Sequence, residues 1–254
     1  MTEHSEEIAR VVAEVLKRLE GEDFGSVLSV QAPAAVAQSG CGGVVYPTVD
    51  AAVKVARKAQ AVFQDQGLEV RRAVIRAMRK AAVADAERLA KMAVEETKMG
   101  RWEDKVRKNL VCATRTPGVE DLTSRAYTGD RGLTLVEYAP YGVVAAVTPS
   151  TNPAATIINN AISILSAGNA VVFAPHPASF KTCVETMSLL CEAAMQAGAP
   201  RGLIATFDKP SQENTKALLA HPDPRVNMGT GGPAIVKVAM TVGKTCKTIA
   251  AGPG

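Results

Sequence analysis

A regular alternation in the second half of the sequence constrains the fold more than any other feature. Short segments that are apolar throughout alternate with longer segments whose apolar residues recur at helical spacing. Strands that are apolar throughout are buried on both faces, as in a parallel sheet covered by helices. The sequence therefore predicts an α/β fold built on a doubly wound parallel sheet. Its strands are expected in GVVAAVTPS (142–150), NAVVFAPHP (169–177), GLIATFDKP (202–210), RVNMGTGG (225–232) and KTIAAGPG (247–254).

Helices are expected to dominate the chain before this alternation begins. Residues 48–63 and 68–100 repeat apolar residues at helical spacing, and residues 101–118 continue the pattern around Trp102, the single tryptophan. LTLVEYAPYG (133–142) is expected to form an extended strand. The second helical segment has a basic face, which we expect to be solvated. That face consists of Arg71, Arg72, Arg76, Arg79 and Lys80.

The first twenty residues stand apart as an amphipathic helix. Residues 21–45 follow it, are rich in Gly, Ser, Ala and Pro, and are interpreted as a flexible linker. So short a helix needs a surface that buries its apolar stripe. That surface is either its own domain or a neighbouring subunit, or else a partner protein for which the helix is a docking peptide. The linker favours the partner. The stripe consists of Ile8, Val11, Val12, Val15, Leu16 and Leu19.

Composition and charge argue against several classes of protein. A net charge of +4 is too small to indicate nucleic-acid binding. No apolar run approaches the length of about 18 residues that a membrane-spanning helix needs, and the acidic N-terminus is unlike a secretory signal. The cysteines lack metal-ligand spacing, so free thiols and no metal are expected. They are Cys41, Cys112, Cys183, Cys191 and Cys246.

Polar turns follow four of the predicted strands, at TPST (148–151), APHP (174–177), FDKP (207–210) and GTGG (229–232). Because parallel strands end at one edge of a sheet, these turns are expected to converge where such sheets bind ligands. The dinucleotide pattern GxGxxG is absent. The glycines of residues 229–232 would let backbone N–H groups approach a phosphate at a helix N-terminus, but an ordinary tight turn explains them equally well.

Six segments in order resemble the CoA-acylating aldehyde dehydrogenases of bacterial microcompartments, of the ethanolamine- and propanediol-utilisation type. They are TPGVEDL (116–122), EYAPYG (137–142), TPSTNPAATIINNAI (148–162), AGNAVVFAPHP (167–177), AHPDPRV (220–226) and GTGGPAIVK (229–237). The resemblance covers about residues 46–254 and implies a Rossmann-like NAD-binding domain. The preceding helix and linker are similar to the family's encapsulation peptide, which implies that residues 5–20 dock on a shell or cargo protein inside a microcompartment of the bacterial cytoplasm.

The resemblance also implies a reaction, in which a short aldehyde, NAD+ and coenzyme A give acyl-CoA and NADH through a cysteine thioester. Such chemistry needs a covalent nucleophile, oxyanion donors and a nicotinamide held in place. Acetaldehyde and propionaldehyde are the expected substrates, and a homo-oligomer is expected for a full-length member of this family.

By resemblance, specific residues receive roles. Thr148, Pro149, Ser150 and Thr151 would line the nicotinamide and substrate end, with either Thr151 or Asn152 as oxyanion donor. The turn Ala174, Pro175, His176 and Pro177 would meet the adenosine, with Ala174 in place of the lysine of hydrolytic relatives. Thr230, Gly231 and Gly232 would lie by the pyrophosphate. Without the family, His176 would more often be a turn residue than a ligand.

The family's nucleophile has no counterpart here, because none of the five cysteines matches its position. Residues Ile249 to Gly252 also lack the glutamate that activates water in hydrolytic relatives, which suits a thioester that must survive until coenzyme A arrives. These features predict a cofactor-binding portion, inactive alone, whose catalytic domain would follow Gly254.

Two other functions stay open. One is a non-catalytic docking or assembly module of a microcompartment, and the other is an acyl-phosphate or semialdehyde reductase of the same superfamily. The aldehyde, and the choice between NAD and NADP, are not determined by the residues.

Overall fold

The computed structural model describes residues 3–21, 43–242 and 246–252. Its centre is a six-stranded sheet in which every neighbouring pair is parallel, with the strand order β1-β6-β5-β4-β7-β8. The predicted parallel α/β sheet is therefore confirmed. The strands are β1 (Val45–Tyr46), β4 (Val143–Thr148), β5 (Ala170–Pro175), β6 (Ile204–Phe207), β7 (Val226–Thr230) and β8 (Lys247–Ala251).

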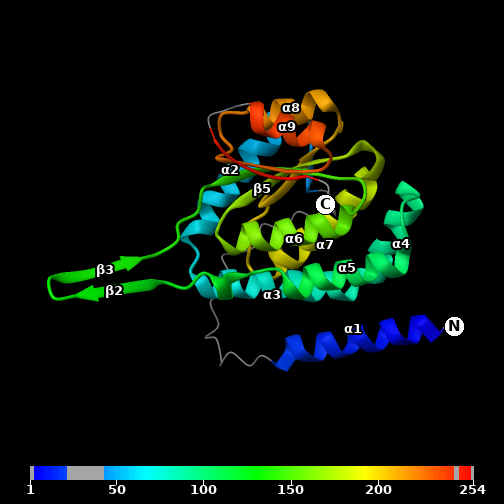
Figure 1. Cartoon of the computed structure of the whole chain (residues 1–254), viewed down its shortest axis with the longest axis horizontal. Helices are drawn as coiled ribbons and strands as arrows, with labels where there is room; N and C mark the ends of the chain where they lie inside the picture. The colour runs from blue at the N-terminus through cyan, green and yellow to red at the C-terminus, as the bar shows by residue number, and fades with distance from the viewer. Residues whose placement is uncertain (1–2, 22–42, 243–245, 253–254) are drawn as a thin grey trace.

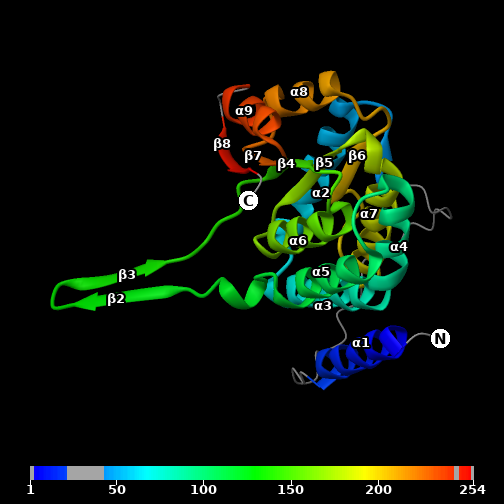
Figure 2. The same cartoon turned by 45° about the vertical axis from the view of Figure 1, so that its right-hand side comes forward.

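Helices cover both faces of this sheet (Figures 1 and 2). On one face lie α6 (Pro153–Ser166) and α7 (Phe180–Gln196), and on the other lie α2 (Val49–Asp65), α8 (Gln212–Ala220) and α9 (Pro233–Thr241). Every residue of β4, β5 and β6 is buried as a result. Uniformly apolar strands are stable only in such a covered sheet, which is why their composition predicted it.

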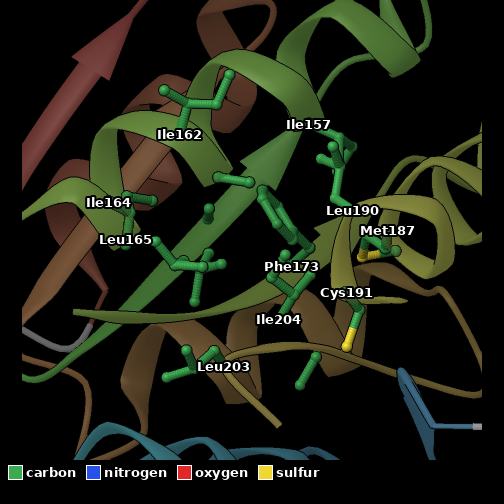
Figure 3. Packing of buried hydrophobic residues seen from close by; sticks show 14 of the residues in the cluster. Ile157, Ile162, Ile164, Leu165, Phe173, Met187, Leu190, Cys191, Leu203 and Ile204 are labelled. Atoms are coloured by element: carbon green, nitrogen blue, oxygen red, sulfur yellow. The ribbon is translucent and has the colours of Figure 1, made fainter. Parts of the chain in front are cut away.

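The core lies where α6 and α7 meet the central strands. Figure 3 shows side chains from four elements gathered there, including Ile157 and Leu165 of α6, Phe173 of β5 and Leu190 of α7. All four are fully buried. Small residues such as Ala161 let these helices approach the sheet closely.

A further layer of helices packs on the outside of α6 and α7 (Figure 1). It consists of α3 (Leu68–Ala84), α4 (Ala86–Thr97) and α5 (Trp102–Arg115). The single helical segment expected at 68–100 is thus two helices, divided at Asp85. The expected helix around Trp102 is confirmed.

The N-terminal helix, α1 (Glu3–Gly21), lies against α3 (Figures 1 and 2). Ile8 is buried, and Val12, Val15 and Leu16 are partly buried against the core. The predicted stripe therefore contacts its own domain, the first of the two surfaces considered. Residues 22–42 of the predicted linker lie outside the described residues, and Val45 begins β1.

A two-stranded hairpin projects from the body of the molecule (Figures 1 and 2). It pairs β2 (Arg125–Gly129) with β3 (Gly132–Val136) in antiparallel register. The strand expected within 133–142 is confirmed for its first part, but its partner β2 was not predicted. Every residue of both strands is exposed, so neither shows the buried-face pattern that identifies a strand.

The expectation that the basic face of α3 is solvated is wrong for Arg79. This residue is 7% exposed and donates hydrogen bonds to the backbone carbonyls of Ala113 and Thr116 and to the carboxylate of Glu120. Carbonyls at the C-terminus of α5 lack partners within their helix, so the guanidinium satisfies them. Charge patterning alone does not reveal such a contact between helices.

Candidate functional site

A cleft of about 860 Å³ opens at the carboxyl ends of the central strands. The turns after β4, β5 and β7 form its floor, and the N-terminal turns of α8 and α9 form its walls. Its lining includes Thr148, Pro149, Ser150, Thr151, Asn152, Ala174, Pro175, His176, Pro177, Ser211, Gln212, Thr215, Lys216, Thr230, Gly231, Gly232 and Gly252. Every residue that the sequence proposed for cofactor binding lies on this one surface, because the strands are parallel.

Contacts with α7 and α5 hold the turn after β4 in place. Thr148 is buried, with its Oγ1 3.8 Å from the Sγ of Cys183 in α7. The Nζ of Lys105 donates to the backbone carbonyl of Thr151 at 2.5 Å, and the Nζ of Lys108 donates to the Oδ1 of Asn152 at 3.2 Å. The second bond uses the amide oxygen of Asn152 as acceptor, so its Nδ2 is left as the donor that the side chain can present.

Lys105 occupies an unusual position for a lysine. It is 6% exposed, and burial, together with the charge of Lys108, lowers the pKa of its ammonium group. Its described partner is a backbone carbonyl rather than a carboxylate. A buried ammonium group is costly unless its hydrogen bonds are made, so this lysine fixes the backbone of the turn at Thr151 strongly.

His176 both shapes its turn and lines the cleft. Its Nδ1 accepts a hydrogen bond from the backbone N–H of Ala178 at 3.1 Å, which caps the short helix η2 (Pro177–Ser179). An Nδ1 that accepts leaves the ring proton on Nε2. His176 is exposed and lines the cleft, and Nε2–H is the donor that its ring can offer. The turn role of His176 is confirmed, and its role as a ligand-binding residue stays a prediction.

The glycine turn after β7 brings α9 close to the sheet. A Cβ on Gly231 would lie 2.6 Å from the Cγ2 of Ile235, so only glycine fits there. A Cβ on Gly232 would meet nothing within 4 Å. Pro233 has no N–H group, so the N–H groups of Ala234 and Ile235 are those of the first turn of α9 that lack partners within the helix, and both residues line the cleft. The contact with Ile235 supports the tight-turn reading of the GTGG segment, and its anion-binding role stays a prediction.

A second pocket, of about 620 Å³, lies on the other side of Asn152. It is formed by α5, α6, β7 and β8, and Thr156, Asn159, Asn160 and Ser163 of α6 give it a polar wall. Asn160 is 6% exposed, and its Nδ2 has no hydrogen-bond partner among the described residues. Asn152, Thr156 and Thr230 line both pockets, so the two spaces meet at the turn after β4, at the start of α6 and at the end of β7.

None of the four described cysteines has the lowered pKa that activates a thiol. Burial raises the pKa of Cys183 to about 12 and raises that of Cys112, Cys191 and Cys246 as well. Cys183 contacts the hydroxyl groups of Thr148 and Ser179 rather than a base. Cys41 lies outside the described residues.

Sequence reasoning missed the contribution of α5 and α8 to the site. Lys105 and Lys108 lie one helical turn apart on α5. In sequence, both are more than forty residues away from the segment after β4 that they hold in place. Ser211 caps the N-terminus of α8, and Thr215 and Lys216 lie in its first turns, directly after a predicted strand and turn. The rule that predicted the strand-end turns applies equally to the helix that follows each turn, and would have found α8.

Groups of three or more metal-ligating side chains do not occur among the described residues. Within the same residues, no helix is both long enough and apolar enough to span a membrane.

Comparisons with known proteins match residues 44–253 to the aldehyde dehydrogenase family. The acetylating acetaldehyde dehydrogenase EutE of Escherichia coli K12 is 45% identical over 239 residues, which are 93% of this chain and 48% of that protein. The propionaldehyde dehydrogenase of the Clostridium phytofermentans fucose utilisation bacterial microcompartment has a TM-score of 0.81 and 41% identity, over 84% of this chain and 48% of that one.

A third similar protein is the Rhodopseudomonas palustris propionaldehyde dehydrogenase, whose structure contains bound propionyl-CoA. It has a TM-score of 0.80 and 44% identity, over 83% of this chain and 46% of that one. The present chain spans about half the length of these relatives. The resemblance to CoA-acylating enzymes is confirmed, and the chain belongs to the aldehyde dehydrogenase family.

Proposed function

We propose that these 254 residues are the cofactor-binding portion of a CoA-acylating aldehyde dehydrogenase. The reaction converts a short aldehyde, acetaldehyde or propionaldehyde, with NAD+ and coenzyme A into acyl-CoA and NADH. The single observation that carries the proposal is the cleft, where the turns after β4, β5 and β7 named from the sequence converge; the fourth named turn, FDKP (207–210), lies outside its lining. The similarity to acetylating and propionaldehyde-oxidising enzymes supports the substrate class.

The cleft fits a dinucleotide in size and in chemistry. Its volume of about 860 Å³ lies within the range of about 300–1,000 Å³ that ligand sites occupy. The amides at the start of α9, beside Thr230, Gly231 and Gly232, would hold the pyrophosphate. His176 and Pro177 would contact the adenosine, and the turn of Thr148, Pro149, Ser150 and Thr151 would meet the nicotinamide. When bound, NAD+ accepts the hydride that leaves the aldehyde carbon.

The chain's own residues would orient the carbonyl oxygen of the aldehyde. Asn152 is better placed than Thr151 for the role of oxyanion donor, because it lines both pockets while Thr151 lines the cleft alone. Lys108 holds the Oδ1 of Asn152, which directs Nδ2 as the donor. Lys105 keeps the backbone beneath it in place.

We propose that these residues alone do not turn over, because the nucleophile is not among them. Raised pKa values keep the thiols of the four described cysteines protonated near neutral pH. Calorimetric titration of the purified chain with NAD+ and an assay of NADH absorbance with aldehyde, NAD+ and coenzyme A test both statements. Saturable binding without turnover is expected. Turnover, or a folded chain that does not bind NAD+, contradicts the proposal.

Residues 5–20 carry a separate proposal, that they dock on a shell or cargo protein and place the enzyme in a bacterial microcompartment in the cytoplasm. The amphipathic stripe supports this, and its contact with α3 means that docking must displace α1 from its own domain. Co-sedimentation of shell protein with the intact chain and with a chain lacking residues 1–20 tests it. Equal co-sedimentation of the two would contradict docking.

A homo-oligomer of the full-length enzyme is the remaining proposal. The exposed hairpin supports it, because Tyr127, Leu133 and Leu135 are each more than half exposed to solvent. Light scattering of the full-length protein with all three replaced by serine is expected to give a smaller species than the wild type. An unchanged mass contradicts a role of the hairpin in assembly.

A further inference from the structure

The main contact of helix α1 is with α3. Figures 1 and 2 show α1 on the outside of the helical layer, alongside α3 and on the opposite side of the molecule from α8 and α9. Because α8 and α9 wall the cleft, the contact between α1 and α3 does not involve the proposed cofactor site. A role of this contact is therefore separate from the binding of a nucleotide.

The contact covers only part of the apolar stripe of α1. Ile8 is 7% exposed, whereas Val11 is 43% exposed. The stripe residues that are partly buried are Val12, Val15 and Leu16. A helix of 19 residues has little stability by itself in water, so α1 needs a surface over its stripe to stay helical. Because Ile8 is the buried anchor among the described residues of the stripe, the contact is weak and α1 separates from α3 readily.

The side of α3 that faces away from the core is suited to a second helix. The residues of its buried face are Val74, Ile75, Met78, Arg79, Ala82 and Val83. Ala73, Ala77 and Ala81 lie outside that face and recur every four residues, so they form one row along the helix. Small side chains in a row let a second helix pack at a short distance between the helix axes.

Charge favours α1 as the helix that occupies this side of α3. Arg72, Arg76 and Lys80 each precede one of the alanines and form a second, basic row beside them. α1 carries Glu7 and Glu14 at exposed positions, seven residues apart and therefore on the same side of the helix. Opposite charges at the flanks of a helix pair select the partner and its orientation, as they do in coiled coils.

The length of chain between α1 and the sheet allows the same pair to form between molecules. Residues 22–44 join α1 to β1, and a segment of that length spans up to about 75 Å. We propose that α3 is an acceptor site for the α1 of a second copy of this chain, and that α1 exchanges between its own α3 and that of a neighbour. Such an exchange costs little, because the contacts are the same in both arrangements. The inference does not depend on the proposed function.

Protein concentration decides which arrangement is populated. The connecting residues keep α1 near its own α3 at an effective concentration of the order of millimolar. At micromolar protein α1 therefore stays on its own chain, and towards millimolar protein it links neighbouring copies. Because the cleft lies on the opposite side of the molecule, linked copies bind a nucleotide as separate ones do.

The first experiment measures mass by sedimentation equilibrium, from about 10 μM to about 1 mM protein. It compares the intact chain with Ile8→Glu and Val11→Glu, which place a carboxylate at a buried and at an exposed position of the same helix. Near the upper concentration, the intact chain and Val11→Glu are expected to have at least about 1.5 times the average mass of Ile8→Glu. Association through any other surface, such as the hairpin, is common to all three proteins.

The second experiment locates the acceptor with a fluorescent peptide of residues 1–21, whose anisotropy reports binding. The peptide is expected to bind the Ile8→Glu chain at least about tenfold more tightly than the intact chain, whose own α1 competes for α3. Adding Arg76→Glu and Lys80→Glu to Ile8→Glu should weaken this binding at least about fivefold. Adding Lys58→Glu, on the exposed surface of α2, should change it by less than about twofold. Circular dichroism establishes that each protein is folded.

Three results overturn the inference. Equal masses of the intact chain and Ile8→Glu at every concentration would restrict the pair to one chain. Equal masses of Ile8→Glu and Val11→Glu would show that the contact at Ile8 is not the one that links copies. Peptide binding that is indifferent to the charge reversals at Arg76 and Lys80 would place the acceptor elsewhere than on α3. NAD+ titration of the same proteins is expected to be unchanged, so a loss of NAD+ binding would count against the proposed function alone.

Discussion

The Nζ of Lys105 on α5 donates to the backbone carbonyl oxygen of Thr151 at 2.5 Å and so ties the outer helical layer to the turn after β4. Thr151 lines the cleft, and Asn152 beside it lines both the cleft and the second pocket. The position of this turn is therefore set by tertiary contact as well as by its own prolines. Three predictions concern contacts of this kind, and a fourth concerns the thiols.

Replacing Lys105 by methionine is expected to change how stability depends on pH. Burial lowers the pKa of Lys105 below 10.5, its value in an unfolded chain. Between the two pKa values the unfolded chain binds more protons than the folded one, so the free energy of unfolding of the wild type rises with pH there. Lys105→Met lacks this contribution. In urea denaturation at a series of pH values below 10.5, the free energy of unfolding of the wild type should rise relative to that of the variant as the pH increases.

The exposed Lys58 supplies the control for this comparison, because Lys58→Met also removes one positive charge, but from the surface of α2. If the free energy of unfolding of the wild type falls or stays constant relative to that of Lys105→Met as the pH rises, Lys105 is not desolvated in the folded chain.

Replacing Arg79 by methionine is expected to lower the free energy of unfolding by about 2–4 kcal/mol. The change leaves the carbonyls of Ala113 and Thr116 without their donor in a buried place. Arg72→Met, on the same helix, removes an exposed pair with Glu69 and should cost less than about 1 kcal/mol. Urea denaturation measures both, and equal costs for the two arginines would refute the bridging role of Arg79.

The two glycines before α9 are expected to respond differently to alanine. A methyl group on Gly231 meets Ile235 at 2.6 Å, so Gly231→Ala should destabilise the fold by about 1–3 kcal/mol. A methyl group on Gly232 projects into open space, so Gly232→Ala should leave stability nearly unchanged and weaken NAD+ binding, because it occupies the space proposed for the pyrophosphate. Thermal unfolding and NAD+ titration together separate the two effects. If a folded Gly232→Ala protein binds NAD+ as tightly as the wild type, the pyrophosphate does not bind at this turn.

Thiol labelling tests the assignment of Cys183 as a structural residue. Its pKa, raised by burial to about 12, and its complete burial predict that a thiol reagent does not label it near neutral pH until the chain unfolds. Mass spectrometry after labelling with and without urea locates the modified residues. Rapid labelling of Cys183 in the folded chain would show that the thiol is accessible and would reopen it as a nucleophile.

Some features of the fold and the site could be predicted from the sequence and others could not, for physical reasons. Apolar strands such as β4 and β5 are recognisable because burial on both faces requires a continuous apolar run, and parallel strands then force their turns together. Lys105 and Arg79 were not recognised as part of the site or core, because their partners are distant in sequence and their chemistry alone suggests solvent. The strand β2 of the hairpin was not predicted for the opposite reason. Tyr127 and Leu135 are apolar but exposed to solvent, so their strands lack the alternation of buried and exposed residues by which a strand is recognised.

A titration of the ¹⁵N-labelled chain with NAD+, followed by amide resonances in NMR spectra, tests the central claim most directly. We predict saturable shifts that are largest at Thr230, Gly231, Gly232 and the turn of His176, with smaller shifts at Thr151. Shifts confined to the hairpin or to α1, or no saturable shift in a folded chain, would contradict the assignment of the cleft as the cofactor site.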